Sequence, residues 1–287
     1  MKLDLFKTLW GHDGDIDSAI ALTLAADFQG IEAPLPAEDA SASHFLTALT
    51  SAGLHWIAEV STCTTPGKYV PNPGHSVAEH LASLDTGIRH SLNGKPLFIN
   101  TMASSDAWSH EDALTFFSGV LNLEQTHGIA ISCETHRGRY THNPWLFGRI
   151  LRALPELKIT ADFSHWCVVT ERLILDEEPA LLELACAHAY HLQTRVGYSQ
   201  GPQVPDPRAP EYADALVAHE RWWDCLWQSQ RARGLTRSTL TPEFGPDGYL
   251  HCAPFTQEPV ADLWDINQWI AHRQRDRFQN LTSSSFT

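Results

Sequence analysis

The feature that most constrains the fold is a regular alternation of short apolar runs with longer segments of helical periodicity. This alternation is typical of βαβ units, in which helices join parallel strands. The predicted strands are 3–9, 30–32, 54–60, 96–100, 128–134, 158–162, 187–193 and 237–243. The predicted helices are 16–28, 41–49, 76–92, 111–125, a segment that begins at Pro144, 179–185, 212–233 and 263–278.

Eight strands and eight helices in strict alternation predict an α/β fold, a single-domain (β/α)8 TIM barrel that spans residues 1–287. The alternative is an open, doubly wound sheet, which often has a glycine-rich phosphate-binding turn after its first strand. Here the first strand is followed by Trp10-Gly11-His12-Asp13-Gly14, which lacks the G-x-G-x-x-G pattern. The barrel is therefore the favoured prediction.

Composition and charge argue against several classes of protein. The formal net charge is −14, whereas binding to nucleic acid or to an anionic membrane surface requires a basic face. No apolar run reaches about 18 residues, the length that a membrane-spanning helix needs. The six cysteines form no C-x-x-C pair, so we expect reduced thiols and a cytoplasmic protein. We expect neither nucleic acid nor a membrane as a partner.

Four consecutive predicted strands end in a polar side chain with an oxygen atom. These residues are Glu134, Asp162, Gln193 and Glu243. In a barrel, side chains at the carboxyl ends of the strands face the active-site mouth. Three carboxylates at one place repel each other unless a cation lies between them. The four residues therefore predict a site for one divalent metal ion, Mn or Mg by ligand type, with Co and Zn as alternatives.

Each of these residues has a simpler interpretation when taken alone. Glu134 and Asp162 could be ordinary acids at helix N-termini, and Glu243 a loop acid. Their shared position at strand ends favours the metal site. His191 lies on the same face of its strand as Gln193 and is the alternative ligand. Gln193 is preferred because it lies at the level of the other three.

Further polar residues follow the same strand ends. His165, three residues after Asp162, could contact substrate or orient the site, or could be an exposed loop histidine. The arginines in the loops could hold a hydroxyl, carboxylate or phosphate group, or be solvated loop charges. Trp10 could stack on a sugar ring. The predicted substrate-binding residues are His136, Arg137, Arg195, His191 and Trp10, with Arg139 as a further candidate.

Two other segments carry their own expectations. The stretch 198–210 is rich in Pro, Gly and Gln and follows the seventh predicted strand, so it is predicted to be a functional loop or to be disordered. Trp222, Trp223 and Trp227 predict a buried helix face, with a dimer contact as the alternative. A homo-oligomer is therefore left open.

Five motifs resemble those of the xylose isomerase-like TIM-barrel superfamily of sugar phosphate isomerases and epimerases. They are Gly30-Ile31-Glu32-Ala33-Pro34, Glu134-Thr135-His136-Arg137-Gly138, Asp162-x-x-His165, His191-Leu192-Gln193 and Thr241-Pro242-Glu243-Phe244-Gly245-Pro246. The resemblance covers essentially the whole chain. It implies that the four strand-end residues bind Mn, Mg, Co or Zn, and that Glu134 and Glu243 act as acid and base. It also implies that His165 contacts substrate or metal.

Two departures from the family pattern narrow the expected activity. Gln193 stands where ketose epimerases often have histidine, and is more like hydroxypyruvate isomerases and inosose dehydratases. Ser199 stands where ketose epimerases have an arginine, which disfavours ketose 3-epimerase activity. The superfamily's apurinic endonucleases have extra histidine ligands, whereas the fourth strand here ends Ile99-Asn100-Thr101. That difference and the acidic charge disfavour an endonuclease.

The resemblance implies a divalent-metal-dependent isomerase or epimerase of a sugar-like hydroxy-carbonyl substrate. Glu134 or Glu243 would remove the proton next to the carbonyl group and the other would return it. His165 and Arg195 would position substrate hydroxyls. The alternatives are a metal-dependent dehydratase of an inosose-like or keto-sugar substrate, and a barrel that binds a sugar without turnover.

Overall fold

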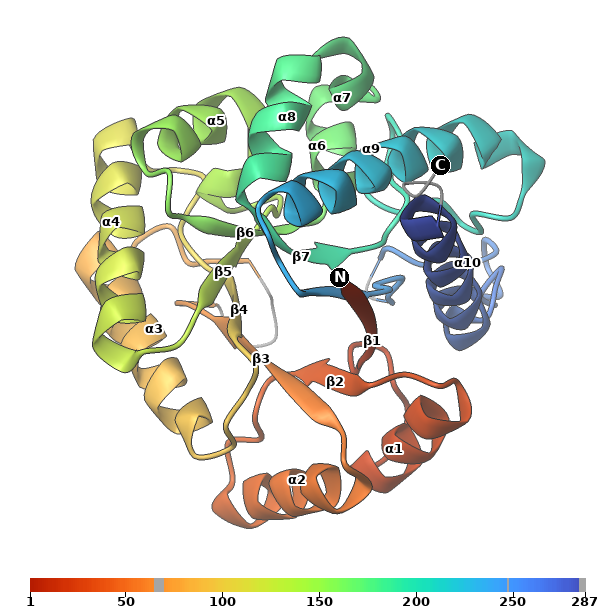
Figure 1. Cartoon of the computed structure of the whole chain (residues 1–287), viewed down its shortest axis with the longest axis horizontal. Coiled ribbons are helices and arrows are strands. Elements are labelled where there is room, and N and C mark those ends of the chain that lie inside the picture. Colours follow the sequence, from red (N-terminus) through yellow and green to blue (C-terminus); the bar gives the residue numbers. More distant parts are fainter. Residues whose placement is uncertain (65–69, 247, 284–287) are drawn as a thin grey trace.

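The structure is a closed barrel of eight parallel strands in the order β1 to β8. It is a computed structural model that describes residues 1–64, 70–246 and 248–283. The helices form an outer ring around the strands (Figure 1), which confirms the predicted (β/α)8 barrel. The strands are β1 Lys2–Thr8, β2 Gly30–Ala33, β3 His55–Ser61, β4 Ile99–Met102, β5 Ile131–Glu134, β6 Lys158–Ala161, β7 Ala189–Gln193 and β8 Arg237–Thr241.

All eight predicted helices are present, with ends shifted by a few residues. They are α1 Ile16–Ala25, α2 Asp39–Ala52, α3 Val77–Leu92, α4 His110–His127, α5 Pro144–Ala153, α8 Pro179–His188, α9 Ala213–Ala232 and α10 Leu263–Ser283. The short helices α6 Ser164–Thr170 and α7 Ile174–Glu177 were not predicted, because they are too short to show a helical period. Two 3₁₀ turns, η1 Tyr140–His142 and η2 Pro210–Tyr212, complete the described elements. No helix in the described ranges is long and apolar enough to cross a membrane.

Local sequence explains where helices begin. Ser76 accepts a hydrogen bond from the backbone N–H of Glu79, whose carboxylate accepts one from the N–H of Ser76. This reciprocal pair satisfies two backbone donors at the start of α3. Asn143 caps α5 in the same sense, and Pro144 occupies the first helical position, where no N–H is required.

The inside of the barrel has an apolar floor and a polar layer above it. Phe6, Ile57 and Phe98 form a small buried cluster that is separate from the main core between strands and helices. The His191 ring lies 5.4 Å from the ring of Phe98, and its Nε2 lies 3.0 Å from Oε2 of Glu32. Side chains therefore fill the lower barrel, and open space begins above this layer.

The loop after β7 is part of the packed structure rather than a free lid. The N–H of Val204 donates to the carbonyl of Val196, at 2.9 Å. The buried Gln203 side chain accepts from the N–H of Gly245 (2.9 Å) and donates to its carbonyl (3.2 Å). Gln203 thus ties this loop to the one that follows β8.

The burial of three tryptophans of α9 decides between a core face and a dimer contact, which the sequence left open. Trp222, Trp223 and Trp227 are each at most 2% exposed within the single chain. They are core residues, as the first interpretation predicts, and they offer no surface to a second copy.

Gly30, the first residue of β2, has no room for a side chain. A Cβ there would lie 2.4 Å from Cε1 of Phe6 and 2.5 Å from the backbone oxygen of His55. We expect Gly30→Ala to lower the free energy of unfolding by about 1–3 kcal/mol through overpacking. Gly74→Ala is the matched control, because its nearest atom is 3.4 Å away. Equilibrium urea denaturation of both variants tests this; equal stabilities would contradict it.

Candidate active site

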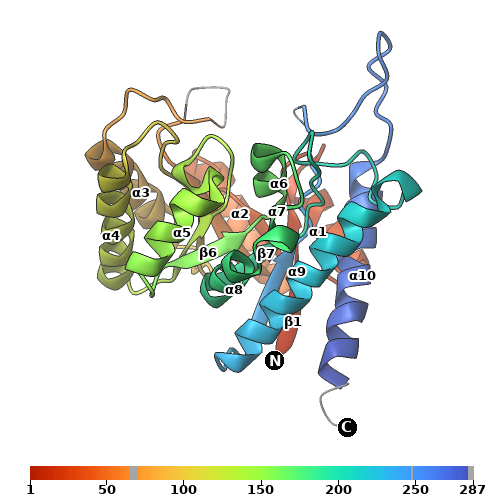
Figure 2. The same ribbon diagram turned by 90° about the horizontal axis from the view of Figure 1, so that it is seen from above.

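A cavity of about 310 Å³ opens at the carboxyl ends of the strands. The N-terminus, where β1 begins, lies on the opposite side of the molecule from the long loop that follows β8 (Figure 2). Its lining combines apolar side chains with the polar groups of the strand ends. The lining residues are Leu9, Trp10, Ala33, Pro34, Glu59, Val60, Ser61, Asn100, Met102, Glu134, His136, Arg195, Glu243 and Tyr249.

The structure brings the predicted metal ligands together. One carboxylate oxygen from each of Glu134, Asp162 and Glu243 lies within 4.8 Å of the others. Gln193 joins them, since its Nε2 donates to Oε1 of Glu243 at 3.1 Å. Glu134 and Gln193 end their strands, and Asp162 follows β6 directly. Glu243 lies two residues beyond β8, because Pro242 has no N–H to extend the strand pairing.

Burial and mutual repulsion make this cluster reluctant to ionise. Burial, and then the nearby Asp162, raise the pKa of Glu134 to about 8. Burial also raises the pKa of Glu243 well above its usual range, with Glu134 and Asp162 adding to the effect against Arg195. The pKa of Asp162 is raised by burial despite its contact with Arg195. A further positive charge would stabilise the ionised forms of all three groups.

The donor set fits a divalent cation. Among the described residues, Oε1 of Gln193 and Oε2 of Glu243 are buried oxygens without a hydrogen-bond donor. Such atoms are costly unless a ligand satisfies them. A second group overlaps the first, since ligand atoms of Glu134, His136 and His165 also lie within 4.8 Å of one another. Oxygen-rich ligation suits Mn or Mg, and imidazole suits Zn or Co.

Arg195 lies within the carboxylate cluster, not at the edge of a solvated loop. Its guanidinium donates to Asp162 and lies 3.4 Å from Oε2 of Glu243. It lies 4.7 Å from the ring centre of Tyr249 and 5.6 Å from that of Trp10. Burial by itself would lower the pKa of Arg195, but the carboxylates of Asp162 and Glu243 outweigh it and raise the pKa. Arg195 is a permanent, fully buried cation.

The rings of the two predicted histidines, His136 and His165, are in contact, with centres 4.0 Å apart and planes tilted by 47°. His165 is buried in α6, so it is not an exposed loop histidine, and its Nε2 accepts from Arg195 at 2.7 Å. His136 lines the cavity, and its Nδ1 lies 2.5 Å from the carbonyl oxygen of Arg137. Burial lowers the pKa of both histidines well below its usual range, so both are neutral.

The other predicted substrate residues are not all in the cavity wall. Trp10 lines the cavity and packs edge-on against Tyr249. His191 lies below the cavity, where Glu32 and Thr239 engage its two ring nitrogens. Arg137 stacks on the Tyr249 ring, 4.5 Å from its centre, and is not among the lining residues.

The fully buried Arg139 donates to the carbonyls of Thr62 and Ser104. It connects loops of the barrel and does not reach the cavity. The interpretation of Arg139 as a solvated loop charge is therefore wrong, because its guanidinium satisfies buried carbonyl groups.

Three further residues, Glu59, Asn100 and Tyr249, contribute polar groups to the lining of the cavity. Glu59 has its pKa raised well above the usual range by burial and by Glu32 and Glu134. Asn100 donates from Nδ2 to Glu32 at 2.7 Å and to Glu134 at 3.4 Å. Glu59 and Asn100 are paired in the β3–β4 register, which brings both to the same level of the barrel. Tyr249 lies in the irregular loop after β8, where no sequence signal identifies it.

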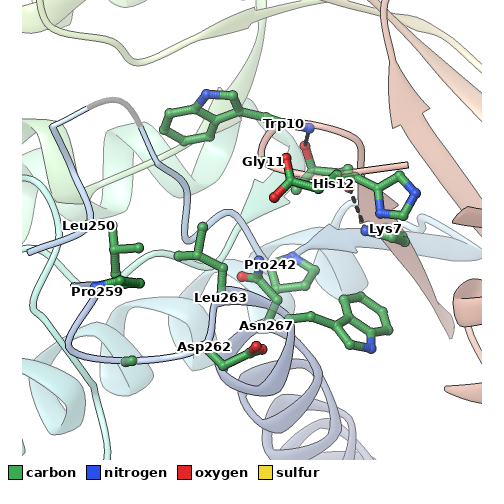
Figure 3. A pocket seen from close by; sticks show the side chains of 14 residues that line it. Lys7, Trp10, Gly11, His12, Pro242, Leu250, Pro259, Asp262, Leu263 and Asn267 are labelled. Carbon is green, nitrogen blue, oxygen red and sulfur yellow. Dashed lines mark hydrogen bonds between the residues drawn. The ribbon is translucent and has the colours of Figure 1, made fainter. Parts of the chain in front are cut away.

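A side pocket of about 270 Å³ lies next to the cavity, between β1 and the start of α10 (Figure 3). Trp10 lines both spaces. Lys7 is buried there, 4.5 Å from the ring centre of Trp264, and donates to the carbonyl of Thr8 at 3.2 Å. Burial lowers the pKa of Lys7 to about 8. Lys7 belongs to this pocket and not to the carboxylate cluster.

No protein-family model matches the sequence, and no curated protein matches it in a sequence comparison. Solved structures do match. A xylose isomerase-like TIM barrel protein from Mycobacterium smegmatis in complex with magnesium has a TM-score of 0.62 at 10% identity, covering 99% of this chain and 98% of that one. D-Allulose 3-epimerase from Methylomonas sp. in complex with D-allulose has a TM-score of 0.59 at 13% identity, covering 96% and 97%.

Other structural matches carry different activities. The probable 3-DHS dehydratase AsbF from Bacillus anthracis has a TM-score of 0.54 at 15% identity, covering 97% of this chain and 98% of that one. Endonuclease IV from Thermus thermophilus has a TM-score of 0.52 at 10% identity, covering 96% and 100%. The predicted resemblance to xylose isomerase-like barrels is thus confirmed at the level of the fold. At these identities the shared fold does not determine the reaction, so the reaction has to be inferred from the residues of the site.

The pKa of Glu134 predicts a specific pH dependence of stability. In the metal-free folded protein this carboxyl keeps its proton up to a pH of about 8, whereas its ordinary pKa is 4.5. Between these values the unfolded chain loses the proton first, so rising pH favours unfolding, by at most about 1.4 kcal/mol per pH unit. The free energy of unfolding in chelator should fall more steeply with pH in wild type than in Glu134→Gln. A constant difference between the two proteins would show that Glu134 ionises normally.

Proposed function

We propose that this protein is a divalent-metal-dependent isomerase or epimerase of a small sugar-like hydroxy-carbonyl compound. The observation that carries the proposal is the convergence of three carboxylates and the Gln193 amide at the base of the cavity. Mutual repulsion makes such a cluster unfavourable without a cation, and its place at the strand ends is where barrel enzymes hold their reacting groups. The structural match in complex with D-allulose supports a sugar-sized ligand for this fold.

Glu134, Asp162, Gln193 and Glu243 would hold the ion. Three carboxylates and an amide favour Mn or Mg, with Co and Zn as alternatives. The structural match in complex with magnesium supports a metal in this fold. When bound, the ion supplies Lewis-acid stabilisation of the negative charge that develops on a substrate carbonyl oxygen.

Glu134 and Glu243 are the two groups suited to move protons. They reach the cavity from β5 and from the end of β8, which are separated by two strands in the ring. One carboxylate would take the proton from the carbon next to the carbonyl, and the other would return a proton to the substrate. Return to the opposite face of the same carbon gives an epimer, and return to the neighbouring carbon gives an isomer.

The remaining walls would orient the substrate and exclude water. Trp10 offers an aromatic face, and His136 offers an imidazole nitrogen beside Glu134. The apolar side chains of the lining would strengthen electrostatic interactions within the cavity by limiting the access of water. Arg137 and His191 lie outside this lining, so the proposed substrate contacts are His136, Arg195 and Trp10. His165 would position Arg195 through their hydrogen bond.

A dehydratase is the second candidate, because the same proton abstraction can expel a neighbouring hydroxyl group as water. The match to a probable 3-DHS dehydratase supports it. We propose a small molecule and not nucleic acid as the partner, because the net charge is −14 and Arg195 is the one arginine or lysine among the lining residues. Six free cysteines support a reducing, cytoplasmic compartment.

Metal content tests the proposal most directly. Elemental analysis of the purified protein should give about one divalent ion per chain, as expected for one four-ligand site. Glu134→Ala and Asp162→Ala should each lose it, while Glu38→Ala should keep it because Glu38 is exposed and makes no side-chain cap. No ion in wild type after incubation with Mn, Mg, Co and Zn would remove the basis of the proposed function.

Turnover distinguishes the proposed reactions. Keto-sugars and related hydroxy ketones would be screened in D₂O with the metal-loaded protein. An epimerase or isomerase should place deuterium next to the carbonyl without change of composition, and a dehydratase should release one water. Glu243→Gln should lower kcat by about 10²–10⁴-fold, as expected for loss of an acid–base group, while leaving the fold intact. Full activity in Glu243→Gln would contradict its proton-transfer role.

A further inference from the structure

The carboxylate cluster already contains a cation. Arg195 is 1% exposed and contacts the carboxylates of Asp162 and Glu243, two of the four residues that would hold the ion. Its Nε donates to Oγ of Ser164 (3.1 Å) and its Nη1 to the backbone oxygen of Glu243 (3.2 Å). The Nη2 that contacts the two carboxylates also lies 2.7 Å from Nε2 of His165. A side chain with this many partners is held in the cluster and does not swing freely.

Arg195 changes what Asp162 can offer to a metal ion. Oδ1 of Asp162 accepts from the N–H (3.1 Å) and the hydroxyl (2.5 Å) of Ser164. Oδ2 accepts from Arg195 and lies 3.3 Å from Nε2 of His165. Both oxygens of Asp162 therefore accept hydrogen bonds. Oε1 of Gln193 and Oε2 of Glu243 accept none, although the latter lies 3.4 Å from Arg195. Oε1 of Gln193 is therefore available to an ion, whereas the guanidinium of Arg195 occupies Asp162.

We propose that Arg195 is an internal cation that competes with the divalent ion for Asp162 and Glu243, and thereby sets the metal affinity of the site. This inference rests on the proposed function, because it concerns the same four ligands. The ion would bind when Asp162 exchanges its contact with Arg195 for one with the metal.

The charges of the cluster are consistent with this competition. The negative charge of three ionised carboxylates is larger than the positive charge of one guanidinium. One guanidinium and one divalent ion together balance it. The guanidinium cannot lose its proton at any ordinary pH, so its repulsion of a second cation is always present. After the exchange it would keep the Glu243 backbone oxygen and His165 as partners and would still face the cavity between Trp10 and Tyr249.

The test is the affinity of the full chain for Mn²⁺, measured by isothermal titration calorimetry at fixed pH after removal of metal. Arg195→Met keeps much of the length of the side chain and removes its charge. Removing a neighbouring positive charge should tighten Mn²⁺ binding by about 10- to 1,000-fold, the range in which neighbouring charges shift ionic equilibria. Arg273→Met is the matched control, because Arg273 also pairs with a buried carboxylate, that of Glu220, but on the outer helices.

Thermal denaturation gives a second readout on the same proteins. Without metal, Arg195→Met should be less stable than wild type, and Mn²⁺ should raise its Tm by more than it raises that of wild type. Should Arg195→Met not fold without metal, Arg195→Gln replaces it in both measurements, since it keeps a donor for Asp162 and loses the charge. Refolding of either variant on addition of Mn²⁺ would also support the proposal.

The other outcomes separate this proposal from the proposed function. Equal or weaker Mn²⁺ binding in folded Arg195→Met and Arg195→Gln would overturn the competition and leave the metal site intact. Binding in the variants but not in wild type would support the competition and contradict a metal-dependent wild-type enzyme. Absence of binding in every protein would overturn both.

Discussion

The central constraint in this structure is the electrostatic repulsion among three buried carboxylates that the barrel holds close together. Glu134, Asp162 and Glu243 are carried to one point because they lie at or just beyond the ends of strands that close into a ring. Burial makes the repulsion stronger, because water no longer screens it. The buried histidines, the guanidinium of Arg195 and the amides of Asn100 and Gln193 all gather around this point. They are best understood as the surroundings that three adjacent carboxylates require.

The lower half of the barrel supplies the rigidity for this arrangement. Phe6, Ile57 and Phe98 fill the floor, and Glu32, Asn100 and His191 form a hydrogen-bonded layer upon it. This layer fixes Asn100, which in turn contacts Glu134. A chain of contacts thus runs from the apolar packing of the floor to the carboxylate cluster, and it positions the charged groups.

The sequence allowed the fold and much of the site to be predicted, for a definite physical reason. Strand ends in a barrel share one level, so Glu134, Asp162 and Gln193 could be grouped from the pattern of apolar runs alone. Side-chain direction beyond a strand end follows no such period. The sequence therefore did not show that Arg195 pairs with Asp162 and Glu243. The position of His191, two residues before the end of its strand, did indicate that it lies deeper in the barrel than Gln193. Tyr249 lies in an irregular loop, and α6 and α7 are shorter than the window in which helical periodicity shows.

The partition between the cavity and the side pocket has a consequence for how such a site can diversify. Trp10 forms this partition, and Gly245 lies against its indole so closely that a methyl group at position 245 would come within 2.1 Å of the ring. A larger residue at position 245 therefore requires a smaller residue at position 10. The size of residue 245 thus depends on residue 10, which lies near the opposite end of the chain. Substitution of both residues could join the cavity and the side pocket into one larger space without a change to any residue of the carboxylate cluster.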